Sequence, residues 1–295
     1  MKNILFAFCG VALLFTGCKE HDIPIDFSIK AISDSTGVSS SVPAPAPHQV
    51  LVEEFTGESC PNCPSAHSDL DKVSTIGAGN GLVNVISMYT AGSPQSIPPS
   101  GAVYDLRDDV ATAVLSGIFG NVGGLPAASI DRVSSGGSVV QVGSSSWDGV
   151  ISSELAIASP VNISVTSAYN AANGTASITA IVTYTQPQTT TQNLSVVIVE
   201  DSISDLQEFP SVVQNYTFMD VFRGMATKVP AGDVLQATAG NDTKEAGRFF
   251  QKVYAYKLPA KTPAIVPAHC RVIAFVNSTN GSDKHILQSA QCPLK

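Results

Sequence analysis

Residues 49–63 read QVLVEEFTGESCPNC, a mostly apolar run followed by a short loop with two cysteines. The run at 49–55 predicts a strand. Pro61 suits the first position of a helix because its ring fixes a helical backbone angle, so we expect a helix from Pro61 to about Val73. Cys60 and Cys63 are then expected at the junction of a strand and a helix.

Two cysteines at this spacing can form a zinc half-site, a structural disulfide or a redox pair. A zinc site needs two further ligands, and His67 supplies only one, so a metal is not favoured. A disulfide that closes so short a loop restricts the unfolded chain very little, although this structural use stays open.

The position of the pair favours redox chemistry. The start of a helix presents unsatisfied N–H groups and the positive end of the helix dipole, and both lower the pKa of a thiol. We therefore expect Cys60 to be partly exposed and to react first. Cys63, one turn inside the helix, is expected to be more shielded and to resolve the mixed disulfide.

The composition points to an exported, β-rich protein. Only 14% of the 295 residues are charged, and the formal net charge is -8. A sparse charge with many small and β-branched residues is typical of β-rich extracytoplasmic proteins. No basic stripe is visible, so we expect no nucleic-acid partner.

The N-terminus has the layout of a secretory leader. One lysine precedes an apolar segment, Ile4–Phe15, which is too short to cross a bilayer comfortably. The segment ends in Phe15-Thr16-Gly17-Cys18, which resembles a bacterial lipobox, although lipoboxes more often carry Leu where Phe15 stands. The resemblance implies a signal peptide at 1–17 and a lipid on Cys18. Residues 18–47 are rich in Ser and Pro and predict a disordered tether.

Residues 48–158 predict a small α/β domain. After the first strand and helix, the pattern predicts an alternation of further strands and helices. The expected elements are a strand at 81–89, a helix at 104–119, a strand at 123–133 and a helix at 145–158.

Residues 159–295 predict an all-β domain, a sandwich of immunoglobulin type, because short strands alternate with turn signals. Asn173-Gly174 supplies a hairpin turn. We leave 207–247 unassigned except for one strand near Met225–Val229. The other expected strands are 160–170, 174–186, 192–203, 248–258, 269–277 and 285–292.

Two further cysteines, Cys270 and Cys292, predict a second disulfide. If the chain between them folds as a hairpin about Asn280-Gly281, the two residues face each other directly, at a distance that a disulfide can bridge. We expect this bond to serve stability, and two buried free thiols are the alternative.

The cysteine motif resembles thioredoxin. VLVEEFTGESCPNC matches the pattern of an apolar strand, an acidic residue, a loop and CxxC. The resemblance implies that Glu54 assists proton transfer to the buried thiol. It also implies that Pro126, in GGLPAASIDR, follows a cis peptide bond and packs against the disulfide. The chain departs from thioredoxin in having Pro61-Asn62 between the cysteines and no Trp before them.

The whole arrangement is similar to the outer membrane protein 28-related family of Bacteroidetes lipoproteins. The likeness covers roughly residues 48–295 and rests on EEFTGESCPNCP, GGLPAASIDR and the β-rich second half. It implies a thioredoxin-like domain followed by an immunoglobulin-like domain. It also implies a lipid anchor in the outer membrane, facing the periplasm or the cell surface.

Two functions follow from this sequence. In the first, Cys60, Cys63, Glu54 and Pro126 carry out thiol–disulfide exchange with the thiols or disulfides of envelope proteins. In the second, the protein is a non-catalytic surface lipoprotein that binds ligands, and its CxxC is a structural disulfide. We expect neither a metal nor a cofactor in either case.

Overall fold

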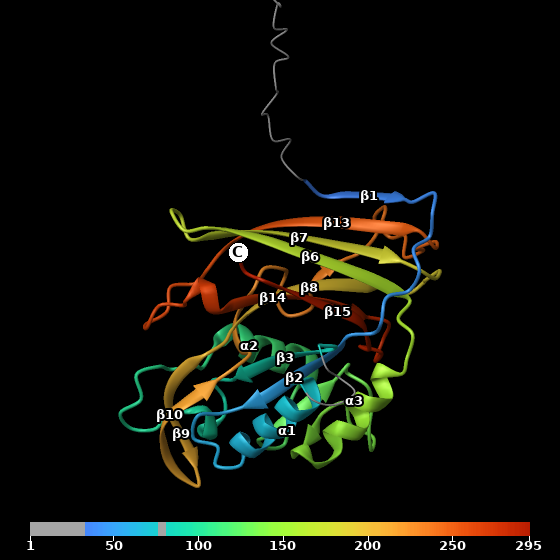
Figure 1. The fold of residues 1–295 in the computed structure, drawn as a ribbon. Helices are drawn as coiled ribbons and strands as arrows, with labels where there is room; N and C mark the ends of the chain where they lie inside the picture. Colours follow the sequence, from blue (N-terminus) through green and yellow to red (C-terminus); the bar gives the residue numbers. More distant parts are fainter. Residues whose placement is uncertain (1–32, 76–80) are drawn as a thin grey trace, which may run out of the picture. The chain divides into compact units, whose positions relative to one another are not determined.

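The computed structural model describes residues 33–75 and 81–295, and Ser33–Lys295 form one compact unit (Figure 1). Cys18, the predicted signal peptide and residues 18–32 of the predicted tether lie outside the described residues. Within the described ranges, every helix is too short or too polar to span a membrane.

The first part of the unit alternates strands and helices as predicted, with α1 beginning at Cys63 rather than Pro61. Asp108 caps α2, since its carboxylate accepts hydrogen bonds from the backbone N–H groups of Val110 and Ala111. The elements are β2 (Val50–Thr56), α1 (Cys63–Thr75), β3 (Val83–Tyr89), α2 (Asp109–Val114) with a π-helical extension (Leu115–Phe119), β4 (Ala127–Ile130), β5 (Gln141–Val142) and α3 (Trp147–Leu155).

The second part consists of strands, and the six that the sequence predicts outside 207–247 are confirmed. Within 207–247 the predicted strand lies slightly earlier, as β11, and the other strands of that region were missed. The elements are β6 (Val161–Asn170), β7 (Thr175–Tyr184), β8 (Gln192–Glu200), β9 (Ile203–Phe209), β10 (Ser211–Phe218), β11 (Val221–Met225), β12 (Asp233–Val234), β13 (Arg248–Lys257), β14 (Cys270–Ser278) and β15 (Ile286–Pro293).

One large sheet combines strands from both parts of the chain, in the order β15-β14-β8-β11-β3-β2-β4-β5. The two parts join where β11 runs parallel to β3, with Val221 opposite Ser87. A second sheet has the order β1-β13-β7-β6, and β9 and β10 form a two-stranded arm. The boundary predicted at residue 158 lies between α3 and β6, but the strands on its two sides share one sheet.

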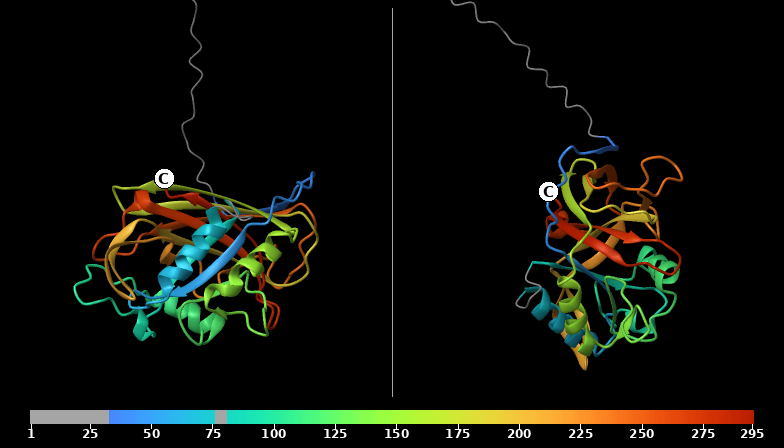
Figure 2. Two further views of the ribbon diagram at one scale, coloured as in Figure 1. Left: turned by 60° about the horizontal axis from the view of Figure 1, so that its bottom comes forward. Right: turned by 90° about the vertical axis from the view of Figure 1, so that its right-hand side faces the viewer.

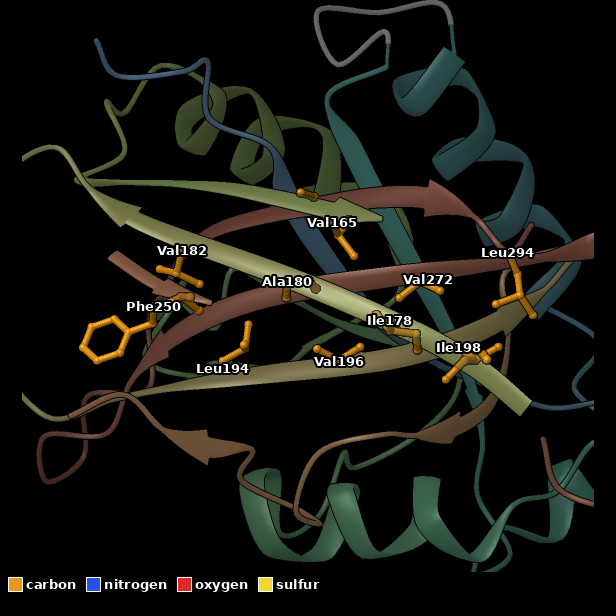
Figure 3. Close-up of a cluster of buried hydrophobic side chains, with 14 of the residues drawn as sticks. Val165, Ile178, Ala180, Val182, Leu194, Val196, Ile198, Phe250, Val272 and Leu294 are labelled. Atoms are coloured by element: carbon orange, nitrogen blue, oxygen red, sulfur yellow. The ribbon is translucent and has the colours of Figure 1, made fainter. Parts of the chain in front are cut away.

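The two larger sheets pack face to face around an apolar cluster (Figure 3). Alternate residues of β8 explain why this strand is buried throughout. Leu194, Val196 and Ile198 point into the cluster between the sheets, whereas Val197 and Val199 point to the opposite face, which α2 covers. The fold is therefore β-rich, as predicted.

Helices cover both faces of the β2–β4 region. α2 packs on one face with Leu51 and Phe55. On the other face, α1 and α3 pack against Val50 and Val52 and lie on the same side of the sheet (Figure 2). Odd-numbered residues of β2 thus face α2, and even-numbered residues, Glu54 among them, face α1.

The predicted tether is shorter than expected at its C-terminal end. Ser35–Val38 form β1, which pairs antiparallel with β13. The carboxylate of Asp34 accepts hydrogen bonds from the Lys252 ammonium and the Val253 backbone N–H. These contacts order residues 34–38, although the composition of this segment predicts disorder.

The predicted disulfide between Cys270 and Cys292 is wrong, because both residues are free thiols. The hairpin is not centred on Asn280-Gly281 as predicted, and a bulge follows Val276, so the residue opposite Cys292 lies two positions from Cys270. Cys292 therefore faces Val272, and Leu294 donates its backbone N–H to the Cys270 carbonyl. Burial raises the pKa of the Cys270 thiol to about 12.

Candidate functional site

Cys60 and Cys63 form a disulfide with an S–S distance of 2.06 Å and a Cα–Cα distance of 5.4 Å. Cys63 is the first residue of α1, and its backbone N–H donates to the Cys60 carbonyl at 3.2 Å. The strand β2 leads into this turn, so the predicted junction of strand, disulfide and helix is confirmed.

Both cysteines are fully buried, with 0% of each residue exposed. The prediction that Cys60 is partly exposed is therefore wrong. A position just before a helix predicts an exposed sulfur only when no distant segment packs on the turn, and residues beyond 206 do so here.

The arm formed by β9 and β10 contacts the disulfide turn and lies beside β2 and α1 (Figure 1). The buried Gln207 side chain donates to the carbonyls of Cys60 and Gly57, at 3.1 and 3.3 Å. The backbone N–H of Glu208 donates to the Glu58 carbonyl at 2.9 Å. These hydrogen bonds attach the arm to the disulfide turn.

Glu54 is 1% exposed and lies under α1. Its Oε2 accepts a hydrogen bond from the Ser87 hydroxyl at 2.8 Å, and its Oε1 lies 3.3 Å from Nε2 of His67. The sequence analysis names His67 only as a possible zinc ligand, and no local motif indicates that His67 pairs with Glu54.

Both ring nitrogens of His67 have hydrogen-bond partners. Nε2 lies 2.9 Å from the Thr56 hydroxyl, and Nδ1 lies 2.7 Å from the Tyr216 hydroxyl. Burial lowers the pKa of His67, but the charge of Glu54, the hydrogen bond to it and the charge of Asp220 outweigh this effect. The net result is a raised pKa, which favours an imidazolium beside Glu54.

Asp220 follows β10 and forms an ion pair with Arg271, which also binds Asp201 at 2.7 Å. The Arg271 guanidinium thus forms ion pairs with two carboxylates. Burial raises the pKa of Asp220 to about 6, with a further contribution from Asp201 and Glu54 that Arg271 partly offsets. Tyr216 and Asp220 belong to the region that the sequence left unassigned, and no local motif indicated them.

A cavity of about 480 Å³ opens between α1, the edge of β3 and the arm. Glu54 and Ser87 line it from the sheet, and His67 lines it from α1. The residues around it are Glu54, Pro64, His67, Ser68, Leu70, Asp71, Val85, Ser87, Phe209, Tyr216, Thr217, Met219 and Asp220. A volume of this size suits a small organic ligand.

The peptide bond between Leu125 and Pro126 is cis, as predicted. Pro126 directly precedes β4, whose Ala127 pairs with Phe55 of β2. The Pro126 carbonyl accepts a hydrogen bond from the backbone N–H of Gly143. The predicted contact of Pro126 with the disulfide stays a prediction. Among the described residues, no cluster of His, Cys, Asp or Glu has a geometry that holds a metal ion.

The site and fold define a β-rich protein with a mixed sheet and a buried CxxC disulfide at the start of a helix. The sequence model of the outer membrane protein Omp28 family matches residues 118–294, which is more than half of the chain. The chain belongs to this family and is an outer membrane protein. No curated protein matches it significantly in sequence.

Solved structures resemble the chain at low sequence identity. HBP35 of Porphyromonas gingivalis has a TM-score of 0.61 at 15% identity, over 84% of this chain and 75% of that chain, which shows a shared fold. A protein of Agrobacterium tumefaciens has a TM-score of 0.45 at 14% identity, over 84% and 95%. A domain of the outer membrane lipoprotein Omp28 from Porphyromonas gingivalis has a TM-score of 0.30 at 13% identity, over 46% and 89%.

Proposed function

We propose that the protein is a lipid-anchored binding protein of the outer membrane in which the Cys60–Cys63 disulfide is structural. The observation that carries this proposal is the complete burial of both cysteines. Thiol–disulfide exchange requires a thiolate to reach a sulfur atom along the S–S axis. A disulfide without exposed surface does not meet that requirement while the arm stays in place.

The anchor in this proposal is Cys18, and its support is the lipobox-like sequence that ends there. Cys18→Ala should abolish the incorporation of a labelled fatty acid and release the protein from the membrane fraction. Cys9→Ala, within the same leader, is the matched control and should change neither result.

The two-part architecture also belongs to the proposal. A thioredoxin-like first part is supported by the strand before CxxC, by Glu54 on that strand and by the cis bond before Pro126. An immunoglobulin-like second part is supported by two sheets that pack face to face around a shared apolar cluster. Such sandwiches commonly bind partners through their loops.

A redox titration against glutathione tests the structural role of the disulfide. We expect a potential well below the glutathione range, as for structural disulfides of exported proteins. Cys63→Ser should trap no mixed disulfide with other envelope proteins. Trapped partners together with a potential in the oxidoreductase range would instead establish the exchange function, with Cys60 as the attacking residue.

A further inference from the structure

The cavity between α1 and the β9–β10 arm has an apolar rim and a hydrogen-bonded polar wall. Phe209 and Met219 line the cavity and are 43% and 48% exposed, which is high for large apolar side chains. On the polar wall, Glu54 Oε1 lies 3.3 Å from Nε2 of His67, and the Tyr216 hydroxyl lies 2.7 Å from Nδ1 of the same ring. The cavity therefore suits a ligand with an apolar body and one polar group that meets this chain of side chains.

The direction of the hydrogen bond between His67 and Tyr216 depends on the charge of the imidazole ring. Nε2 faces the Glu54 carboxylate, which only accepts hydrogen bonds, so this nitrogen carries a hydrogen in both the neutral and the charged ring. In the neutral ring Nδ1 is then an acceptor, and the Tyr216 hydroxyl donates to it. In the imidazolium Nδ1 also donates, so the Tyr216 oxygen accepts and its own O–H can donate elsewhere.

With a charged His67, the Tyr216 O–H is a donor without an acceptor. Among the described residues, His67 is the one hydrogen-bond partner of the Tyr216 hydroxyl, and Tyr216 lines the cavity. Burial lowers the pKa of His67, but the neighbouring Glu54 raises it by more, so the charged ring is favoured. An acceptor atom of a ligand would satisfy this O–H.

The charges of the wall favour a neutral ligand. Glu54 is paired with His67, and Asp220 is paired with Arg271. A cationic ligand would therefore compete with a cation that is already in place at each of these two carboxylates. Among the described residues that line the cavity, His67 is the one basic side chain, so an anionic ligand would meet no unpaired positive charge.

We propose that this cavity binds a small neutral molecule with a carbonyl group, whose oxygen accepts the Tyr216 hydrogen bond and whose apolar body packs against Leu70, Val85 and Phe209. The inference rests on the proposed binding function and names the ligand class of its site. It does not depend on whether the disulfide exchanges. A carbonyl oxygen fits because it accepts a hydrogen bond and carries no net charge.

Calorimetric titration of the full mature chain with its disulfide intact tests the inference at pH 6.5, below the raised pKa of His67. The probe is N,N-dimethyl-3-phenylpropionamide, which has a carbonyl acceptor and no N–H donor. The anion 3-phenylpropionate and the cation 3-phenylpropylamine are the matched comparisons. We expect each charged compound to bind at least about tenfold more weakly than the amide. Equal or tighter binding of either charged compound would overturn the proposal.

Two pairs of variants locate the site. Tyr216→Phe should lower amide affinity about tenfold, as for the loss of one hydrogen bond, whereas Tyr169→Phe, outside the cavity lining, should not. Ser68→Trp leaves the hydrogen-bonded chain intact and places a large side chain in the cavity from the exposed surface of α1. Ser65→Trp, on the same helix but outside the lining, is its control. Unchanged amide binding in Ser68→Trp contradicts the assignment.

The pH dependence of amide binding tests the role of His67. The groups that face this ring are Glu54 of β2, Tyr216 of β10 and Asp220 between β10 and β11, and Asp71, one turn further along α1, has an interaction of its own. Between pH 6.5 and pH 9 the ring loses its charge, whereas Asp220, with a pKa raised by burial to about 6, stays mainly ionised. Burial also raises the pKa of Tyr216, so its hydroxyl keeps its proton.

The advantage of the wild type over Tyr216→Phe in amide affinity should therefore be about tenfold at pH 6.5 and vanish at pH 9. The same ratio at both pH values would contradict the role of His67. Tighter binding of N-acetylphenylalanine methylamide than of the probe would assign the site to a protein segment instead of a small molecule. Binding of no carbonyl compound, with the disulfide still unreactive in the glutathione titration, refutes this site and leaves the proposed structural role of the disulfide intact.

Discussion

Glu53 and Arg132 form an ion pair in the interior, with each side chain only 2% exposed. Two parallel hydrogen bonds of 2.7 Å join them, and the guanidinium lies 5.5 and 5.3 Å from the ring centroids of Phe119 and Phe275. Arg132→Met leaves the Glu53 carboxylate buried without a partner. We expect a loss of about 3–5 kcal/mol in the free energy of unfolding, measured with urea.

The pair between Lys72 and Asp69 is the surface control for this prediction. Its side chains are 64% and 47% exposed, so solvent screens the interaction. Lys72→Ala should change the free energy of unfolding by less than about 1 kcal/mol. Similar losses in the two variants would contradict the role assigned to the buried pair.

The buried Glu58 carboxyl should make the free energy of unfolding depend on pH. The residue is fully buried, and burial raises the pKa of its carboxyl to about 8 from an ordinary value of 4.5, with smaller contributions from Asp105 and Asp205. The folded protein holds this proton to higher pH than the unfolded chain does. The contribution of Glu58 to stability is therefore present below pH 4.5 and falls as pH rises toward about 8.

Glu58→Gln should remove this slope, because an amide does not titrate and can still accept the hydrogen bond from the Leu106 backbone N–H. At pH 9 the variant is expected to be more stable than the wild type, with a smaller difference at pH 5. Urea unfolding across this range measures the effect. Parallel stability curves for the two proteins would contradict it.

At the scale of elements, the β9–β10 arm is hydrogen-bonded to the disulfide turn, and we expect it to limit access to the sulfur atoms. Gln207 is fully buried and donates to the carbonyls of Cys60 and Gly57. Gln207→Ala should loosen the arm and accelerate reduction of the disulfide by dithiothreitol about tenfold, as expected for the loss of roughly 1.4 kcal/mol of hydrogen bonding. The exposed Gln214, in the same arm, provides the control Gln214→Ala. Equal acceleration in both variants would mean that Gln207 does not hold the arm.

The sequence predicted strands and helices well where apolar residues recur at a regular spacing and a turn motif follows them. β6 and β7 are an example, since their alternation and Asn173-Gly174 define a hairpin. β9 and β10 were missed because the usual alternation of buried apolar and exposed polar residues is absent: β9 buries Asp205 and Gln207, and β10 is mostly exposed. The pairing register of β14 and β15 depends on a bulge after Val276, and no residue type in that stretch indicates a bulge.

The candidate site was predicted only in part for the same reason. Cys60, Cys63, Glu54 and Pro126 lie within or beside a recognisable motif, and the disulfide and the cis bond are as expected. The exposure of Cys60 was predicted wrongly, because burial depends on a segment about 150 residues further along the chain. Tyr216 and Asp220 reach the cavity through that same segment.

At the scale of the whole molecule, the shared sheet predicts cooperative unfolding. β11 joins β3 in parallel, so the strands of both chain halves depend on one hydrogen-bonded sheet. We expect a single calorimetric transition for the mature chain, with equal calorimetric and van't Hoff enthalpies. Two separate transitions, one of them retained by a fragment of residues 48–158, would instead indicate independent domains.

The central claim is that the fold itself shields the Cys60–Cys63 disulfide. Its most direct test compares the rate of reduction by dithiothreitol in the native chain with that in an oxidised peptide of residues 57–66. We predict that the native disulfide reacts at least about a hundredfold more slowly, and that urea brings the rate to the peptide value only as the chain unfolds. Reduction at the peptide rate under native conditions would contradict the claim.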